Sequence, residues 1–161
     1  MKRAVVITAS NRAFNGIYED RSGQILVEGL TSFGYLVGPA TVLPDDIDQI
    51  QGAIKSSIAA RVDLVVTTGG TGVSPMDLTP EATQPLIKKF MPGILEAFRA
   101  YSREKVPMTD LSRGFAGVAE NTLIINLPGS PGAAKDGLVI IGRLASHIHD
   151  QLEGHDHSPS N

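Results

Sequence analysis

Three glycines and an aspartate follow a short apolar run and have the residue types of a phosphate site. Gly69, Gly70 and Gly72 stand within four positions, directly after a β-branched segment. Because glycine has no Cβ, its backbone adopts unusual angles and allows a ligand to approach closely. Asp77 follows in a loop, before a threonine, Pro80 and a glutamate that indicate a helix start. This order of strand, glycine hairpin, acid and helix start is typical of a phosphate site.

The same glycines also have a purely structural explanation. Many tight strand-to-helix turns need glycine only to change direction. Thr71, inside the hairpin, either binds phosphate or satisfies the turn. The segment is not a Walker loop, since no Gly-Lys-Ser or Gly-Lys-Thr follows, and its spacing does not match a dinucleotide fingerprint. Two common nucleotide-binding motifs are therefore disfavoured.

Apolar segments of strand length alternate with segments of helical periodicity. We expect strands at residues 4–8, 36–43, 63–67 and 122–127. We expect helices at residues 22–33, 47–60, 80–90, 93–104 and 131–151. The alternation predicts an α/β fold with three layers, in which helices flank a mostly parallel sheet. Ligands of such sheets bind beyond the carboxyl ends of the strands, so the loops after the four strands should meet at one site.

Length and composition predict one domain. A chain of 161 residues with 42% hydrophobic residues can bury an ordinary core. We assign residues 1–153 to this domain and expect the polar tail 154–161 to be disordered. His155 and His157 in the tail are expected to be solvated rather than to bind a metal. Without cysteine, the chain has no thiolate nucleophile and no zinc-thiolate site.

Charge and hydropathy restrict the partners. The apolar runs have strand length, far below the roughly 20 residues that cross a bilayer. Met1 leads directly into the first strand without a signal-like region, so we expect a soluble, cytoplasmic protein with no membrane partner. A net charge of -3 argues against a nucleic-acid partner, although a local basic pocket for a small anion is compatible with it.

Several ordered motifs resemble the molybdopterin-binding domain family of molybdenum cofactor biosynthesis, in particular its molybdopterin adenylyltransferases. The motifs are NGIYEDRSG (15–23), VLPDD (42–46), TTGGTG (67–72), SPMDLTPEA (74–82), LSRGFAGV (111–118) and TLIINLPGSPGAAKDGL (122–138). The similarity covers nearly the whole chain, in order.

The resemblance implies both a reaction and an assembly. Members of this kind form homotrimers and use Mg-ATP to adenylylate the terminal phosphate of molybdopterin, with release of pyrophosphate. The resemblance also implies that the product is handed over to a molybdenum-insertion protein. Molybdopterin and ATP are thus the implied substrates, and Mg²⁺ the implied cofactor.

The resemblance also implies roles for particular residues. Those assigned to nucleotide phosphates are Gly69, Gly70, Thr71 and Gly72. Those assigned to the pterin are Ser112, Pro128, Gly129 and Ser130. Asp45 and Asp77 match the functional acidic positions of the family and are the candidate catalytic residues.

Attack of one phosphate on another brings two anions together, which requires a divalent cation, backbone amides and positioned donors. We hypothesise that Asp77 is the metal ligand that holds Mg²⁺ on the triphosphate, since magnesium favours carboxylate oxygens, phosphates and retained water. Asp45 would assist metal binding or orient the pterin.

Each candidate also has a structural alternative. Asp45, next to Asp46, could cap the following helix, and Asp77 could form a turn with nearby backbone. Ser112 could be a helix cap, and Ser130 could cap the helix that starts directly after it.

Two positions depart from the family pattern. Met76 stands where the family often has arginine, and Asn11 where it often has aspartate. Compensating positive charge could come from Arg12, Arg21, Arg113 or Lys135.

These departures leave an alternative function open, a non-catalytic molybdopterin-binding protein of the same superfamily. A third interpretation is a flavodoxin-like carrier, which the general topology suggests. The aromatic content of 5% and the lack of a flavin-stacking loop argue against it.

Overall fold

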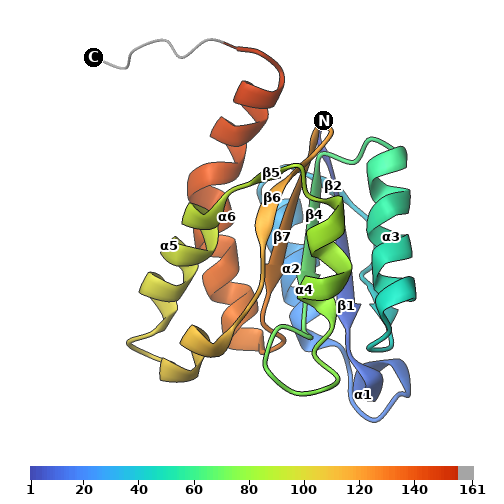
Figure 1. Cartoon of the computed structure of the whole chain (residues 1–161). Coiled ribbons are helices and arrows are strands. Elements are labelled where there is room, and N and C mark those ends of the chain that lie inside the picture. Colours follow the sequence, from blue (N-terminus) through green and yellow to red (C-terminus); the bar gives the residue numbers. More distant parts are fainter. Residues whose placement is uncertain (156–161) are drawn as a thin grey trace.

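A seven-stranded sheet forms the centre of the protein, and the computed structural model describes residues 1–155 (Figure 1). The strands are β1 (Arg3–Ala9), β2 (Leu36–Val37), β3 (Thr41–Leu43), β4 (Leu64–Thr68), β5 (Lys89–Phe90), β6 (Ala116–Ala119) and β7 (Thr122–Leu127). Their order is β2-β1-β4-β7-β6-β5, and β3 also pairs with β1. Pairs among β1, β2, β3, β4 and β7 are parallel, whereas β6 and β5 continue the sheet antiparallel.

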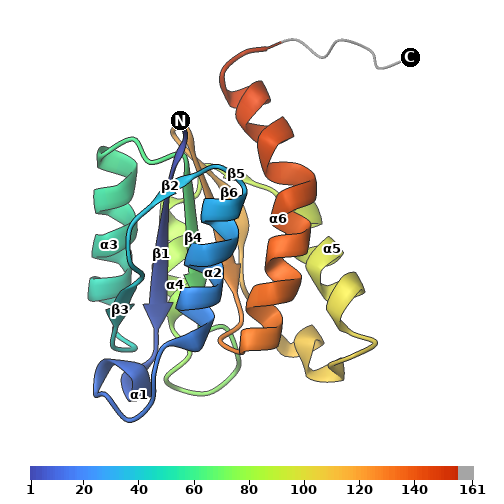
Figure 2. The ribbon, with the colours of Figure 1, turned by 180° about the vertical axis from the view of Figure 1, so that it is seen from behind.

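Helices cover both faces of the sheet (Figures 1 and 2). They are α1 (Asn11–Phe14), α2 (Arg21–Ser32), α3 (Ile47–Ala59), α4 (Thr79–Thr83), α5 (Pro92–Ser102) and α6 (Pro131–Leu152), with 3-10 turns η1 (Gln84–Leu86) and η2 (Pro107–Leu111). The helices α2, α5 and α6 pack on one face, and α3 and α4 on the other. The predicted three-layer α/β fold is confirmed. No helix within residues 1–155 has both the length and the apolar character to cross a bilayer.

Alternation along the central strands supplies two separate cores. In β4, Leu64 and Val66 pack with α2, α5 and α6, whereas Val65 packs with α3 and α4. Val65 is in register with Val5 of β1 and Ile124 of β7. A slip of one residue would move every side chain to the opposite face, so the two cores fix the register. This register aligns the carboxyl ends of the three strands.

Two predicted elements are wrong in extent. The expected strand 36–43 is split into β2 and β3, because Gly38 and Pro39 lie between them and proline has no N–H for the ladder. The expected helix 80–90 ends as α4 at Thr83 and continues as η1 and β5. Pro85 lies at this break, where its ring and missing N–H oppose an α-helix.

The domain boundary stays a prediction. The last helix ends at Leu152, and the chain is described through His155. The predicted disorder of residues 154–161 therefore concerns mainly residues outside the described part of the chain, and Asp156 and His157 also lie there.

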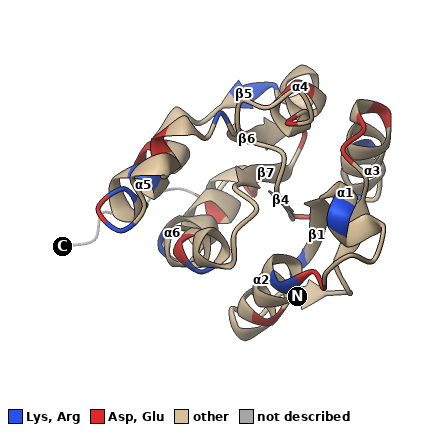
Figure 3. Cartoon of the chain, turned by 90° about the horizontal axis from the view of Figure 1, so that it is seen from below, with Lys and Arg blue, Asp and Glu red and all other residues tan. Residues whose placement is uncertain are grey.

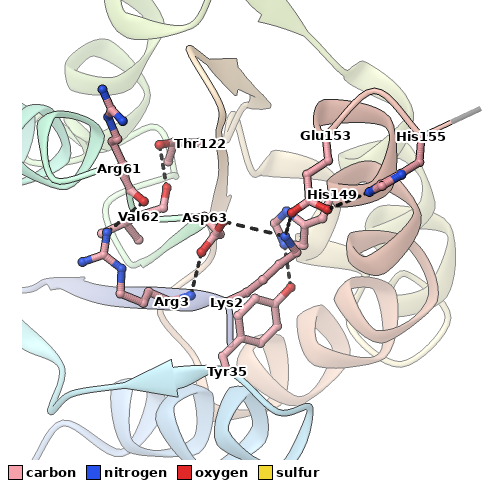
Figure 4. Close-up of polar contacts among 10 residues, drawn as sticks. All are labelled: Lys2, Arg3, Tyr35, Arg61, Val62, Asp63, Thr122, His149, Glu153 and His155. Atoms are coloured by element: carbon pink, nitrogen blue, oxygen red, sulfur yellow. Dashed lines mark hydrogen bonds and ion pairs between the residues drawn. The ribbon is translucent and has the colours of Figure 1, made fainter.

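A polar cluster lies at the end of the sheet where the parallel strands β1 and β4 begin (Figure 4). His149 of α6 is buried, and its Nε2 lies 2.8 Å from the hydroxyl of Tyr35. Lys2 forms ion pairs with Asp63 and Glu153 beside them. Burial lowers the pKa of His149, with a contribution from the charge of Lys2, and raises the pKa of Tyr35 to about 12.

This cluster makes stability depend on pH. Folded His149 resists protonation, whereas in the unfolded chain it takes up a proton below about pH 6.5. The unfolded state therefore binds more protons as the pH falls through that value, and the fold loses stability. We expect urea unfolding to show a larger loss between pH 7.5 and pH 5.5 for the wild type than for His149→Gln, which cannot titrate there. Equal losses in both proteins would contradict the role of His149.

Candidate functional site

A cleft of about 1310 Å³ opens at the carboxyl ends of the parallel strands, which point downward in Figure 1. Figure 3 views the protein from this side and shows acidic and basic residues interspersed on the surrounding elements. Every predicted site residue lines the cleft, namely Asp45, Gly69, Gly70, Thr71, Gly72, Asp77, Ser112, Pro128, Gly129 and Ser130. The structure therefore brings them together, and their individual roles are a separate question.

The strand register explains this convergence. Thr68 of β4 is paired with Thr8 of β1 and with Leu127 of β7, so the three following loops begin at one level. Leu43 of β3 is paired with Ala9, which brings the loop after β3 to the same edge. The loops after all four strands thus surround one cleft.

The hairpin conformation requires glycine at two positions. Gly69 and Gly70 have φ values of +95° and +68°, which side chains rarely tolerate. A Cβ on Gly69 would lie 2.3 Å from the carbonyl oxygen of Ala9, and one on Gly70 would lie 2.4 Å from Oγ1 of Thr79. The turn itself therefore requires glycine at both positions. The same glycines leave the backbone of the hairpin uncovered by side chains at the cleft.

Thr79 does not act as the expected helix cap. It lies inside α4, and its hydroxyl donates to the carbonyl oxygen of Gly69 at 2.9 Å. Leu78, at the cap position, makes no side-chain capping bond. Thr79 instead fixes the hairpin, together with its own N–H, which donates to the carbonyl of Gly70.

Asp77 combines a turn with a position in the cleft. Its Oδ2 accepts the N–H of Ser74 at 2.9 Å, and its own N–H donates to the carbonyl of Ser74. A Cβ on Gly72 would lie 2.7 Å from this Oδ2, so glycine at position 72 leaves room for the carboxylate. The turn orients the carboxylate and leaves Oδ1 for a further ligand.

Asp45 is not the helix cap. Asp46 caps α3 by accepting the N–H of Gln49 at 2.9 Å. Asp45 instead exchanges two hydrogen bonds with Asn11: its Oδ2 accepts the N–H of Asn11 at 3.2 Å, and its N–H donates to Oδ1 of Asn11 at 2.8 Å. Burial raises the pKa of Asp45, and the nearby charge of Asp77 acts in the same direction.

The departures from the family pattern now have a structural context. Asn11 orients Asp45, and Met76 lines the cleft with 47% of its surface exposed. Of the four candidate cations, Arg12 and Arg21 line the cleft, whereas Arg113 and Lys135 lie outside its lining.

The residues assigned to the pterin lie directly beside the glycine hairpin. Ser112 does stand at a helix end, the C-cap of η2, and its buried hydroxyl donates to Oγ1 of Thr71 at 3.1 Å. Ser130 does cap α6, since its Oγ accepts the N–H of Ala133. The carbonyl of Gly129 accepts the hydroxyl of Ser22 at 2.8 Å. The cap at Ser130 and its position in the cleft coexist.

Three further carboxylates line the cleft and are not among the predicted site residues, namely Glu19, Asp20 and Asp136. Asp20 accepts bonds from the hydroxyl of Thr8 and the N–H of Gly23, and so caps α2. Asp136 is buried and accepts from Ser102 and, at 2.7 Å, from Lys105. An acid on the otherwise apolar stripe of the predicted helix 131–151 was the available signal for Asp136.

The carboxylates of the cleft fit magnesium rather than a preformed metal cage. Across residues 1–155, no three or more His, Cys, Asp or Glu side chains gather to hold a metal ion. The charge of Asp77 is close enough to Asp45 to contribute to its raised pKa. One or two carboxylates, completed by substrate phosphates and water, are the usual magnesium site of a nucleotide enzyme.

Comparisons with known proteins identify the family of the chain. The family described as a probable molybdopterin binding domain matches residues 5–147. A molybdopterin adenylyltransferase of Helicobacter pylori is 44% identical over 154 residues, covering 92% of this chain and 86% of that protein. One of Pyrococcus furiosus is 38% identical, covering 89% and 86%. The structure of the molybdopterin biosynthesis Mog protein from Mycobacterium ulcerans superposes with a TM-score of 0.89 at 41% identity, covering 94% of this chain and 99% of that one.

Proposed function

The chain belongs to the molybdopterin-binding domain family, and we propose that it transfers the adenylyl group of ATP to the terminal phosphate of molybdopterin, releasing pyrophosphate. It is a nucleotidyltransferase of molybdenum cofactor biosynthesis, as are the relatives named above. The observation that carries the proposal is one cleft that contains both the glycine hairpin and the two carboxylates.

The volume of the cleft suits two substrates. Pockets for a single small ligand usually measure about 300–1,000 Å³. The cleft of about 1310 Å³ exceeds this range and is lined by groups of two kinds. Backbone of Gly69–Gly72 and the two carboxylates are the groups proposed for the triphosphate, and Ser112 with residues 128–130 are those proposed for the pterin. The two groups are in contact, since the hydroxyl of Ser112 donates to Oγ1 of Thr71, so the nucleotide and the pterin would lie side by side.

In the proposed reaction, an oxygen of the terminal phosphate of molybdopterin attacks the α-phosphorus of ATP. A new P–O bond forms, and the bond from the α-phosphorus to the bridging oxygen breaks, so pyrophosphate leaves with the electron pair. The hairpin amides would donate to the triphosphate, and Asp77, assisted by Asp45, would hold Mg²⁺ there. Bound Mg²⁺ would supply positive charge against the developing negative charge.

Other features stay predictions from the sequence and from the resemblance. They are the homotrimer, the cytoplasmic location and the hand-over of the product to a molybdenum-insertion protein. Size-exclusion chromatography with light scattering tests the first.

Pyrophosphate release tests the proposal against the non-catalytic alternative. We expect purified protein to release pyrophosphate from Mg-ATP when anaerobically prepared molybdopterin is added, and not without it. Binding of molybdopterin without any release would indicate a passive binding protein instead.

A further inference from the structure

Arg113 lies behind the glycine hairpin and connects it to the loop that carries Asp77. Its Nε donates to the carbonyl oxygen of Gly72 at 2.7 Å, and its Nη2 donates to the carbonyl oxygen of Asp77 at 3.0 Å. Its backbone N–H donates to the carbonyl of Thr71 at 2.8 Å. Gly72 and Asp77 line the cleft, whereas Arg113 does not. Arg113 therefore touches the phosphate-binding residues from outside.

The third nitrogen of the guanidinium contacts a helix. Nη1 forms an ion pair with Glu81 in the first turn of α4. Three nitrogens of one planar group thus reach three acceptors in different directions, a geometry that the single ammonium of lysine does not reproduce. This arrangement ties the hairpin, the Asp77 loop and α4 to one point.

The loop from Gly72 to Asp77 needs such a tie because it has no regular structure. Val73 is 72% exposed and Met76 is 47% exposed, so these side chains contribute little packing. The bonds between Asp77 and Ser74 fix the shape of the turn but not its place relative to the hairpin. Thr79 anchors the far end of the loop. The bonds from Arg113 fix where Asp77 lies relative to the hairpin.

We infer that Arg113 is a positioning residue, which fixes the Asp77 carboxylate relative to the hairpin so that both engage one triphosphate. The inference rests on the proposed function. It assigns the nucleotide half of the site, and not the pterin half, to Arg113. A displacement of about 1 Å in such a site can cost on the order of 100-fold in rate.

Charge alone does not explain the residue. Glu81 neutralises the guanidinium, and the side chains of this ion pair are 38% and 45% exposed. An exposed pair of this kind contributes little to stability. Glu81→Gln removes the pair but leaves the bonds to Gly72 and Asp77, so this variant separates the ion pair from the positioning.

The test compares Arg113→Lys, Arg113→Gln and Glu81→Gln with Arg103→Gln as the matched control. Arg103 pairs with Asp110 at 3.1 Å on the surface and does not line the cleft. Pyrophosphate release gives kcat and KM for each substrate, calorimetry gives the affinity for Mg-ATP, and thermal unfolding monitors the fold.

We expect both Arg113 variants to lower kcat/KM for Mg-ATP by about 100-fold, with KM for molybdopterin unchanged. Glu81→Gln and Arg103→Gln should stay close to the wild type. Wild-type kinetics of Arg113→Lys would overturn the inference, because charge alone would then suffice. A KM for molybdopterin that rises as much as the KM for Mg-ATP would also overturn it. A wild type that binds Mg-ATP without releasing pyrophosphate would instead refute the proposed function. In that case the affinity of the Arg113 variants for Mg-ATP, measured by calorimetry, would still test whether Arg113 positions the nucleotide-binding residues.

Discussion

Asp77→Asn is expected to lower kcat on the order of 100-fold or more while leaving the fold intact. Asparagine keeps a side-chain oxygen that accepts the N–H of Ser74, so the turn seen in the structure survives the change. It removes only the negative charge that would hold Mg²⁺. The substitution thus separates the two explanations of Asp77 that the sequence left open.

Asp46→Asn is the matched control for this experiment. Asp46 is the neighbour of Asp45, but it caps α3 and does not line the cleft. Asparagine is an equally good N-cap, so stability and turnover should both be retained. Pyrophosphate release and thermal unfolding are measured for both variants. Wild-type turnover of Asp77→Asn would show that the aspartate serves only the turn.

Gly69→Ala should cause the largest loss of stability. Its φ of +95° strains any side chain, and the new Cβ would lie 2.3 Å from the carbonyl oxygen of Ala9. Because that oxygen belongs to the backbone of β1, the strand and the hairpin must move apart. We expect a loss on the order of 3 kcal/mol in the free energy of unfolding, together with loss of turnover.

Gly16→Ala isolates the contribution of backbone strain. Gly16 has a φ of +74°, and a Cβ there would meet no atom within 4 Å. Its substitution should cost about 1 kcal/mol. Urea unfolding compares the two variants. If Gly69→Ala cost no more than Gly16→Ala, the close approach of the hairpin to β1 would not be needed.

The sequence predicted those parts of the fold that depend on regular patterns. The strand 122–127 and the helix 131–151 agree almost to the residue with β7 and α6. The strand is a continuous, mostly apolar run, and the helix keeps a helical period of apolar residues over its length. Strand β6 (Ala116–Ala119) was missed, since four small residues carry little pattern. The pattern of residues 80–90 predicts a helix that is too long, because Pro85 interrupts the α-helix and α4 ends at Thr83.

The site was predictable where glycine, proline or an acid marks it locally. Its supporting contacts were not, because they join residues that are far apart in the chain. Arg113 meets Gly72 across 41 positions, and Asn11 meets Asp45 across 34. The register of the whole sheet brings these partners together, through the parallel pair β1–β3 for Asn11 and through β4, β7 and the antiparallel β6 for Arg113. Periodicity says nothing about individual side chains across such distances.

The most direct test of the central claim is transfer of label from ATP labelled at the α-phosphate. Purified protein is incubated anaerobically with labelled ATP, magnesium and molybdopterin, and the pterin product is separated. Our account predicts labelled, adenylylated molybdopterin in an amount equal to the pyrophosphate released, and its loss in Asp77→Asn. Unlabelled molybdopterin that is nevertheless bound by the protein would contradict it.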